Sequence, residues 1–202
     1  GKRMLLLSSS PEIHDNKPKA WFDTLTNFDL ALMRWLMQST AELADELGFT
    51  QEGRHWRAVL SEFPDFAYGE DGRLLIAKDH ALPFSHRHFS HLMAIHPLGL
   101  IDWSDGPKAK QTIKANLAEL NKLGPKLWCG YSYAWLANLA ARARDGVKAE
   151  RALEVLRSVP VSAGSVRVGR VVEAAAGGPV LLASRIGGPR VVDMLSGEQL
   201  PR

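Results

Sequence analysis

The sequence predicts an all-α fold built from antiparallel helical pairs. Apolar residues recur at three- and four-residue steps in several stretches between residues 28 and 157. Short loops containing Gly or Pro separate these stretches, which is typical of neighbouring antiparallel helices. No strands alternate with helices in the pattern that a parallel sheet requires.

The first pair of helices is expected between residues 28 and 63. The first helix covers residues 28–47, with Asn27 as its N-cap and Gly48 just after its end. The second covers residues 51–63 and ends before Pro64, since proline cannot continue a helix. The apolar face of the first helix consists of Leu30, Met33, Leu36, Met37, Ala44 and Leu47.

A turn at Asp71-Gly72 and a short strand over 73–77 follow this pair. Pro107 suits a first helical turn, and Gly124-Pro125 is a stop signal. The remaining helices are expected over residues 88–96, 107–122, 131–144 and 147–157.

The last part of the chain has a different composition. Residues 159–202 contain no aromatic residue, no His and no Lys, and are rich in Val, Gly, Ala and Arg. We therefore divide the chain into a helical part, 1–158, and an atypical tail, 159–202. The tail is expected to be irregular and poorly structured, and its sequence is consistent with a truncated or out-of-frame end.

Composition excludes several classes of protein. The chain is 46% hydrophobic with a net charge of +3, and no apolar run approaches the roughly 18 residues of a membrane helix. There is no basic stripe with interleaved aromatic residues, so we expect neither a nucleic-acid nor a membrane partner. The single Cys129 forms no disulfide within the chain and supports no zinc cluster. Met4–Leu7 is too short for a signal peptide, and nothing else indicates a compartment.

The richest polar cluster is Ser85–Met93, which contains three imidazoles, a guanidinium and two hydroxyls. Such groups beside an apolar segment cost free energy unless they are paired or used, so the cluster predicts a polar ligand site or a satisfied internal network. His86, His88 and His91 offer metal-ligand spacing. However, Arg87 lies among them and no HExxH pattern is present, which disfavours a metal. A polyhydroxylated ligand suits the His and Arg donors better.

The segment Ser8–Glu12 allows two interpretations. Ser9 and Glu12 have the spacing of a helix capping box, with Pro11 in the first turn. Alternatively, Glu12 is a proton-donating acid, which needs a pKa raised by burial near aromatic walls. Trp21 and Phe22 are close enough in sequence to form such a wall.

A third cluster, residues 127–135, carries four aromatic side chains. Helical spacing places Trp128, Tyr131 and Trp135 on one face, which fits either a sugar-stacking platform or core packing. Trp135 is expected in the core, whereas Trp128, which precedes the helix, is the better candidate for a ligand contact.

Taken together, four motifs resemble glycoside hydrolase family 95, a family of inverting α-L-fucosidases and some α-L-galactosidases. The resemblance covers about residues 4–157. The motifs, in order, are Ser10-Pro11-Glu12, His86-Arg87-His88-Phe89-Ser90-His91-Leu92, Gly130-Tyr131-Ser132-Tyr133-Ala134-Trp135 and Arg144-Asp145-Gly146.

The resemblance implies that the chain is part of an (α/α)6 toroid. It implies that Glu12 is the general acid and that Arg87 and His88 hold the sugar. The family's base is an aspartate that polarises a water held by asparagines. The asparagines would lie before Gly1, and the Ile-Asp-Gly-Asn motif expected after residue 157 is not found, since Asp193 has different neighbours.

We therefore predict the acid-bearing portion of a glycosidase that removes terminal α-linked fucose or a related sugar from oligosaccharides. Glu12 is catalytic, and Arg87, His88, His86 and Trp128 bind the substrate. No metal or other cofactor is expected, and the chain alone is expected to be nearly inactive because inversion needs an activated water as well as an acid. Two alternatives stay open: a non-catalytic helical-repeat binding module, and a metal-dependent hydrolase using His86, His88 and His91.

Overall fold

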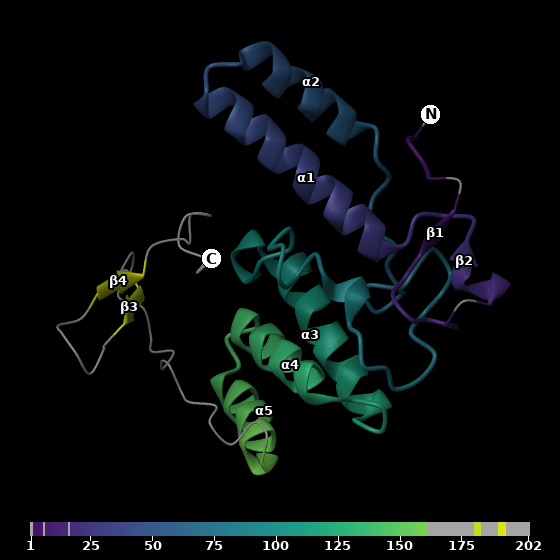
Figure 1. Cartoon of the computed structure of the whole chain (residues 1–202), viewed down its shortest axis with the longest axis vertical. Helices are drawn as coiled ribbons and strands as arrows, with labels where there is room; N and C mark the ends of the chain where they lie inside the picture. Colours follow the sequence, from purple (N-terminus) through teal and green to yellow (C-terminus); the bar gives the residue numbers. More distant parts are fainter. Residues whose placement is uncertain (1, 6, 16, 161–179, 183–189, 193–202) are drawn as a thin grey trace.

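A computed structural model describes residues 2–5, 7–15, 17–160, 180–182 and 190–192, and the described part is mainly helical. Figure 1 shows the hairpin of α1 (Asn27–Glu46) and α2 (Thr50–Ser61) on one side. The stack of α3 (Pro107–Leu123), α4 (Gly130–Arg142) and α5 (Gly146–Ser158) lies on the other. The predicted all-α fold class is thereby confirmed.

A short strand pair leads into the first hairpin. Strand β1 (Ser8–Ser9) pairs antiparallel with β2 (Trp21–Phe22), in the register Ser8 to Phe22 and Ser9 to Trp21. A 3-10 turn, η1 (Pro18–Ala20), precedes β2, and the chain between the strands forms a tight turn that carries Glu12. The capping-box interpretation of Ser9 and Glu12 is wrong, because no helix begins here and Ser9 belongs to β1.

The helix boundaries agree with the predictions to within a few residues, but α1 has a different cap. The side chain of Thr26 accepts a hydrogen bond from the N–H of Asp29, so Thr26 is the N-cap. Asn27, the predicted cap, is only 1% exposed, and its side chain leaves the helix. It donates to the carbonyls of Ala67 and Leu75, both at 2.8 Å, and accepts from the N–H of Ala67 at 2.9 Å.

The expected strand over 73–77 is replaced by isolated bridges, Tyr68 to Leu74 and Ala77 to His80. In this segment, side chains from α1 and α3 form hydrogen bonds with backbone groups that would pair with a neighbouring strand in a sheet. The carbonyl of Leu75 is bonded by Asn27, and the N–H of Leu74 donates to Oδ1 of Asn116 at 3.2 Å. This loop is therefore held by helices on both sides of it.

The expected helix over 88–96 is also absent. Only a 3-10 turn, η2 (Ser90–Leu92), forms there, and a second one, η3 (Trp103–Asp105), precedes α3. Phe89, Leu92 and Ile95 are at most 1% exposed. The apolar character of this segment thus reflects burial on all sides and not the one-sided burial of a surface helix.

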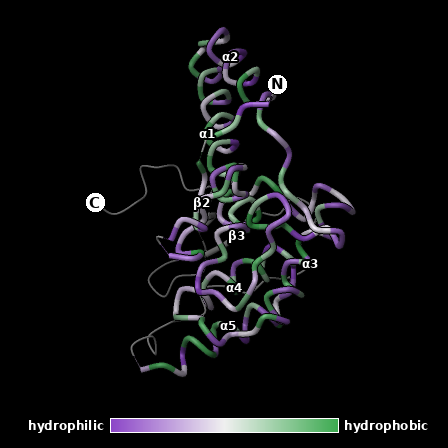
Figure 2. Tube along the Cα trace, turned by 90° about the vertical axis from the view of Figure 1, so that its right-hand side faces the viewer, coloured by the Kyte–Doolittle hydropathy of each residue, from purple (hydrophilic) through white to green (hydrophobic). Residues whose placement is uncertain are grey.

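The main core lies between the 74–101 segment and helices α3 and α4, with Phe89, Leu92, Ile113 and Leu139 at its centre. A smaller core of Leu25, Leu30, Val59 and Phe63 joins α1 to α2. Figure 2 shows apolar and polar residues alternating along the helices, as expected for helices with one buried face. No helix in the described part of the chain has the length and apolarity to cross a membrane.

In the tail, strands β3 (Val180–Leu182) and β4 (Arg190–Val192) pair antiparallel. The prediction that 159–202 is irregular otherwise concerns residues outside the described ranges, and the same is true of Asp193.

Asn27 provides a stability test. Asn27→Ala should lower the free energy of unfolding by about 2–4 kcal/mol, because the carbonyl of Leu75 and the N–H of Ala67 lose their partner and the carbonyl of Ala67 loses one of its two. Asn138→Ala is the matched control: Asn138 is exposed on α4 and bonds only within its own helix, to Ala134, so its loss should cost under about 0.5 kcal/mol. Urea denaturation of both variants measures the difference, and equal losses would contradict the role given to Asn27.

Candidate active site

Glu12 is held on a turn with an unusual backbone. The φ angles of Glu12, His14 and Asp15 are 57°, 62° and 51°, the left-handed region that non-glycine residues rarely adopt. Each such residue costs about 1–2 kcal/mol, so the surrounding contacts must hold the turn in place. The side chain of Ile13, only 2% exposed, anchors the turn in the core.

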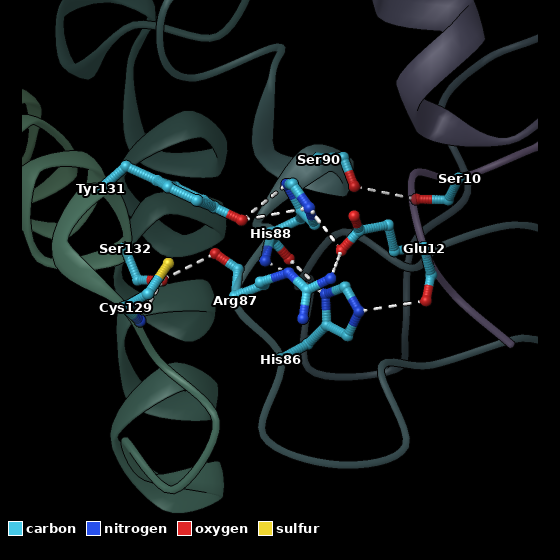
Figure 3. Close-up of polar contacts among 9 residues, drawn as sticks. All are labelled: Ser10, Glu12, His86, Arg87, His88, Ser90, Cys129, Tyr131 and Ser132. Atoms are coloured by element: carbon cyan, nitrogen blue, oxygen red, sulfur yellow. Dashed lines mark hydrogen bonds and ion pairs between the residues drawn. The ribbon is translucent and has the colours of Figure 1, made fainter. Parts of the chain in front are cut away.

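An arginine and a histidine meet the Glu12 carboxylate (Figure 3). Nη2 of Arg87 forms an ion pair with Oε2 of Glu12, and Nε2 of His88 lies 2.8 Å from the same oxygen. Since a carboxylate only accepts hydrogen bonds, Nε2 of His88 carries a proton and donates it. The structure therefore brings together three of the predicted site residues, although 76 positions separate Glu12 from His88.

Helix α4 supports this group from its N-terminal turn. Oη of Tyr131 lies 3.2 Å from Nδ1 and 3.1 Å from Nε2 of His88. The buried hydroxyl of Ser132 donates to the backbone carbonyl of Arg87 at 2.7 Å and accepts from the N–H of Cys129 at 3.1 Å. These contacts fix the Arg87-His88 segment against α4.

A hollow of about 440 Å³ opens beside the acid. We call it the Glu12 hollow; its lining includes Ser9, Ser10, Glu12, Asp15, Trp21 and Arg87. Trp21 is 54% exposed, whereas Phe22 is buried in the core. Of the two aromatic residues expected to form a wall near Glu12, only Trp21 does so.

His86 and Trp128, both predicted to bind substrate, occupy more internal positions. His86 is 6% exposed, and its ring nitrogens face backbone groups of Glu12 and His88. Trp128 packs edge-on against Phe89 and Tyr133, with both ring-centroid distances at 5.3 Å. Trp135 also packs on the core, as expected, and donates from Nε1 to the carbonyl of His96.

The electrostatics of Glu12 differ from the expectation for a proton donor. Partial loss of solvent acts to raise its pKa, but the hydrogen bond from His88 and the charges of His88 and Arg87 outweigh this effect. The pKa of Glu12 is therefore lowered from its ordinary value of 4.5, and the expectation of a raised pKa is wrong for this state of the protein. Tyr131 shows the opposite direction, since loss of solvent and its neighbour Cys129 raise its pKa to about 12.

The geometry gives no support to a metal site. Among the described residues, no three His, Cys, Asp or Glu side chains are placed to hold an ion. His91 is buried, and this burial is the main cause that lowers its pKa to about 3. His88 instead turns toward Glu12 and Tyr131.

Sequence reasoning missed the contacts of Tyr131, Ser132 and Ser90 with the acid-bearing group. Ser90 bonds to Ser10 through their hydroxyls at 2.9 Å, which ties the two segments together. The aromatic spacing of 128–135 was the signal for Tyr131, but it did not distinguish the exposed ring from the two that pack on the core.

A helical domain that presents a carboxylate, an arginine and a histidine beside an open hollow has the features of a site for a polar ligand. The sequence matches the glycosyl hydrolase family 95 catalytic domain over residues 1–173, so the chain belongs to that family. No match was found among curated proteins. The protein is thus a glycoside hydrolase with a carbohydrate substrate, and its helical hairpins fit a toroid-type domain.

The lowered pKa of His91 predicts a pH dependence of stability. Between its unfolded value of 6.5 and its folded value of about 3, the unfolded chain binds a proton that the folded chain does not. Stability should therefore fall as the pH drops through this window and be unaffected by His91 above it.

His91→Gln removes this titration and should reduce the slope of unfolding free energy against pH by about 1 kcal/mol per pH unit. His55→Gln, at an exposed position of α2, is the control and should leave the slope unchanged. Denaturation at several pH values between about 4 and 7 measures both. An unchanged slope in His91→Gln would contradict the buried neutral state of this imidazole.

Proposed function

We propose that the chain carries the proton donor and part of the sugar-binding wall of an inverting α-L-fucosidase-like enzyme. The observation that carries this proposal is the contact of both Arg87 and His88 with the Glu12 carboxylate beside an open hollow. These are the residues that the family resemblance assigns to the acid and to the sugar contacts. The substrate is a terminal α-linked fucose or a related sugar on an oligosaccharide.

In the reaction, Glu12 gives its proton to the glycosidic oxygen while the bond from that oxygen to the anomeric carbon breaks. A water attacks the anomeric carbon from the opposite face and passes its own proton to a base. The described residues provide no assigned base. The 202-residue chain is therefore expected to bind sugar weakly and to hydrolyse it very slowly.

The lowered pKa of Glu12 has an explanation within this proposal. A sugar hydroxyl that accepts hydrogen bonds from Arg87 and His88 takes those donors away from the carboxylate. The sugar also removes water from the hollow, which disfavours the charged carboxylate. Both changes raise the pKa of Glu12, so that the substrate itself brings the acid into its protonated form.

Trp21 is the aromatic residue best placed to contact a sugar ring, because its exposed side chain lines the same hollow as Glu12. His88 and Arg87 supply donors to hydroxyl groups from the other segment. For Trp128, a sugar contact stays a prediction. Its packing against Phe89 and Tyr133 favours a role in shaping the wall from behind.

The alternative of a non-catalytic binding module is favoured by one observation. Trp35, Leu36 and Leu43 are exposed on α1, which leaves apolar surface on that helix. Membership of a glycoside hydrolase family and the composition of the Glu12 site favour catalysis. The metal-dependent alternative lacks a ligand set among the described residues.

Hydrolysis tests the acid. Release of fucose from a 2′-fucosyl oligosaccharide should be slow, and Glu12→Gln should lower the residual rate by about 100-fold or more. Glu62→Gln is the matched control, since Glu62 is also a partly exposed carboxylate paired with an arginine, Arg3. A rate that Glu12→Gln leaves unaltered refutes the acid role. Rapid hydrolysis abolished by Glu12→Gln would instead show that the base lies within this chain.

Calorimetric titration with the same oligosaccharide tests the coupling between sugar and proton. Binding should take up as much as one proton and become tighter as the pH falls between about 7 and 4, because the bound state has the higher pKa. Proton uptake is measured by repeating the titration in buffers of different ionisation enthalpy. Glu12→Gln should abolish the uptake, and uptake that persists in this variant would assign the proton to another group.

The same titrations test Trp21. Trp21→Ala should weaken binding by about 10-fold, equivalent to about 1.4 kcal/mol, as expected for one aromatic contact. Trp35→Ala is the control, because Trp35 is similarly exposed but lies on α1. Equal effects of the two substitutions would remove Trp21 from the site.

A further inference from the structure

The turn that carries Glu12 must be held from outside. Glu12, His14 and Asp15 have positive φ angles, which are unfavourable for these residue types, so the turn would not be stable without contacts to the rest of the protein. Besides the contacts of the Glu12 carboxylate with Arg87 and His88, two polar contacts join the turn to the 86–90 segment: Ser10 to Ser90 through their hydroxyls, and the carbonyl of Glu12 to Nε2 of His86 at 3.3 Å (Figure 3). The contact of His86 is made with the backbone of Glu12, the proposed acid.

Hydrogen-bond chemistry fixes the protonation of His86. The backbone N–H of His88 lies 3.1 Å from Nδ1 of His86 and can only donate, so Nδ1 is unprotonated. The carbonyl of Glu12 can only accept, so Nε2 carries the proton. The carbonyl of His88 lies farther from Nδ1, at 3.2 Å, so the contact with the N–H is the shorter of the two and is taken as the hydrogen bond. His86 is thus neutral and bridges the two segments.

The surroundings of His86 leave it little access to a ligand. It is 6% exposed, both ring nitrogens have backbone partners, and its ring lies 6.1 Å from that of Phe84 and 5.5 Å from that of His88. The titratable groups around it are His88 on one side and the buried His91 on the other. Both ring nitrogens of His86 are therefore already hydrogen-bonded within the protein.

We propose that His86 is a positioning residue. As a neutral imidazole with its proton on Nε2, it holds the backbone carbonyl of Glu12 and so keeps the carboxylate against Arg87 and His88. This positioning role takes the place of the direct sugar contact that the sequence analysis predicted for His86. The role in catalysis rests on the proposed function, but the role in placing Glu12 does not.

The protonation state is measurable in the unaltered 202-residue chain. Nitrogen-15 NMR of the histidine rings should show His86 with Nε2 protonated and Nδ1 bare at neutral pH. A proton on Nδ1, or a doubly protonated ring, would overturn the proposal. This measurement needs neither sugar nor a substitution.

Two substitutions test the effect on Glu12. His86→Leu removes both contacts, so the carboxylate should leave Arg87 and His88, and the pKa of Glu12, followed by carbon-13 NMR of its side chain, should rise toward its ordinary value. His86→Gln, which can both donate and accept, should retain most of the unaltered behaviour. His96→Gln is the control, because the imidazole of His96 is also partly buried and its Nδ1 makes no hydrogen bond.

Sugar binding separates the two roles of His86. A positioning role predicts that affinity for a 2′-fucosyl oligosaccharide and the titration of Glu12 change together in His86→Leu and recover together in His86→Gln. Weaker binding with an unchanged Glu12 titration would indicate a direct sugar contact and refute the proposal. If the unaltered chain binds no sugar while His86→Leu still shifts Glu12, the proposed function fails and the positioning role stands.

Discussion

The start of α1 is the junction on which the described structure depends. Ser8, at the end of the chain's first segment, donates to Asp29 at 2.6 Å and accepts from the N–H of Thr26 at 2.9 Å. Asn27, the residue after Thr26, donates hydrogen bonds to two carbonyls of the 67–75 loop. These buried polar contacts leave no freedom in how β1, α1 and the loop meet, because a displaced partner would strand a buried donor or acceptor. The position of Glu12, four residues after Ser8, follows from this constraint.

The second constraint is electrostatic. Arg87 and His88 stabilise the charged form of Glu12, although a proton donor must be able to hold a proton. Under the proposed function, the donors that keep the acid ionised are also the groups that the sugar engages. Helix α4 takes part through Tyr131 and Ser132, which hold His88 and the backbone of Arg87. The acid and helix α4 are therefore linked through two adjacent residues.

The sequence was informative where one residue type determines a local structure. Pro107 begins α3, Gly124 ends it, and the apolar periodicity located the five α-helices of the described residues. Prediction from the sequence failed where tertiary contacts determine the local structure. Asn27 has the chemistry of a cap but reaches the 67–75 loop, and residues 88–96 are apolar because they are buried, not because they are helical. The motifs identified Glu12, Arg87 and His88, but the left-handed turn and the bridging role of His86 depend on segments more than 70 positions apart.

One detail of the carboxylate has a stereochemical consequence. Arg87 and His88 both contact Oε2 of Glu12, so this oxygen fixes the plane of the carboxyl group. The two oxygens are then unequal: Oε2 serves as the anchor, and Oε1 is the atom on which a proton disturbs the anchor least. A group with this asymmetry can be protonated without being reoriented. The direction of proton delivery would then be set by the fold before any sugar arrives.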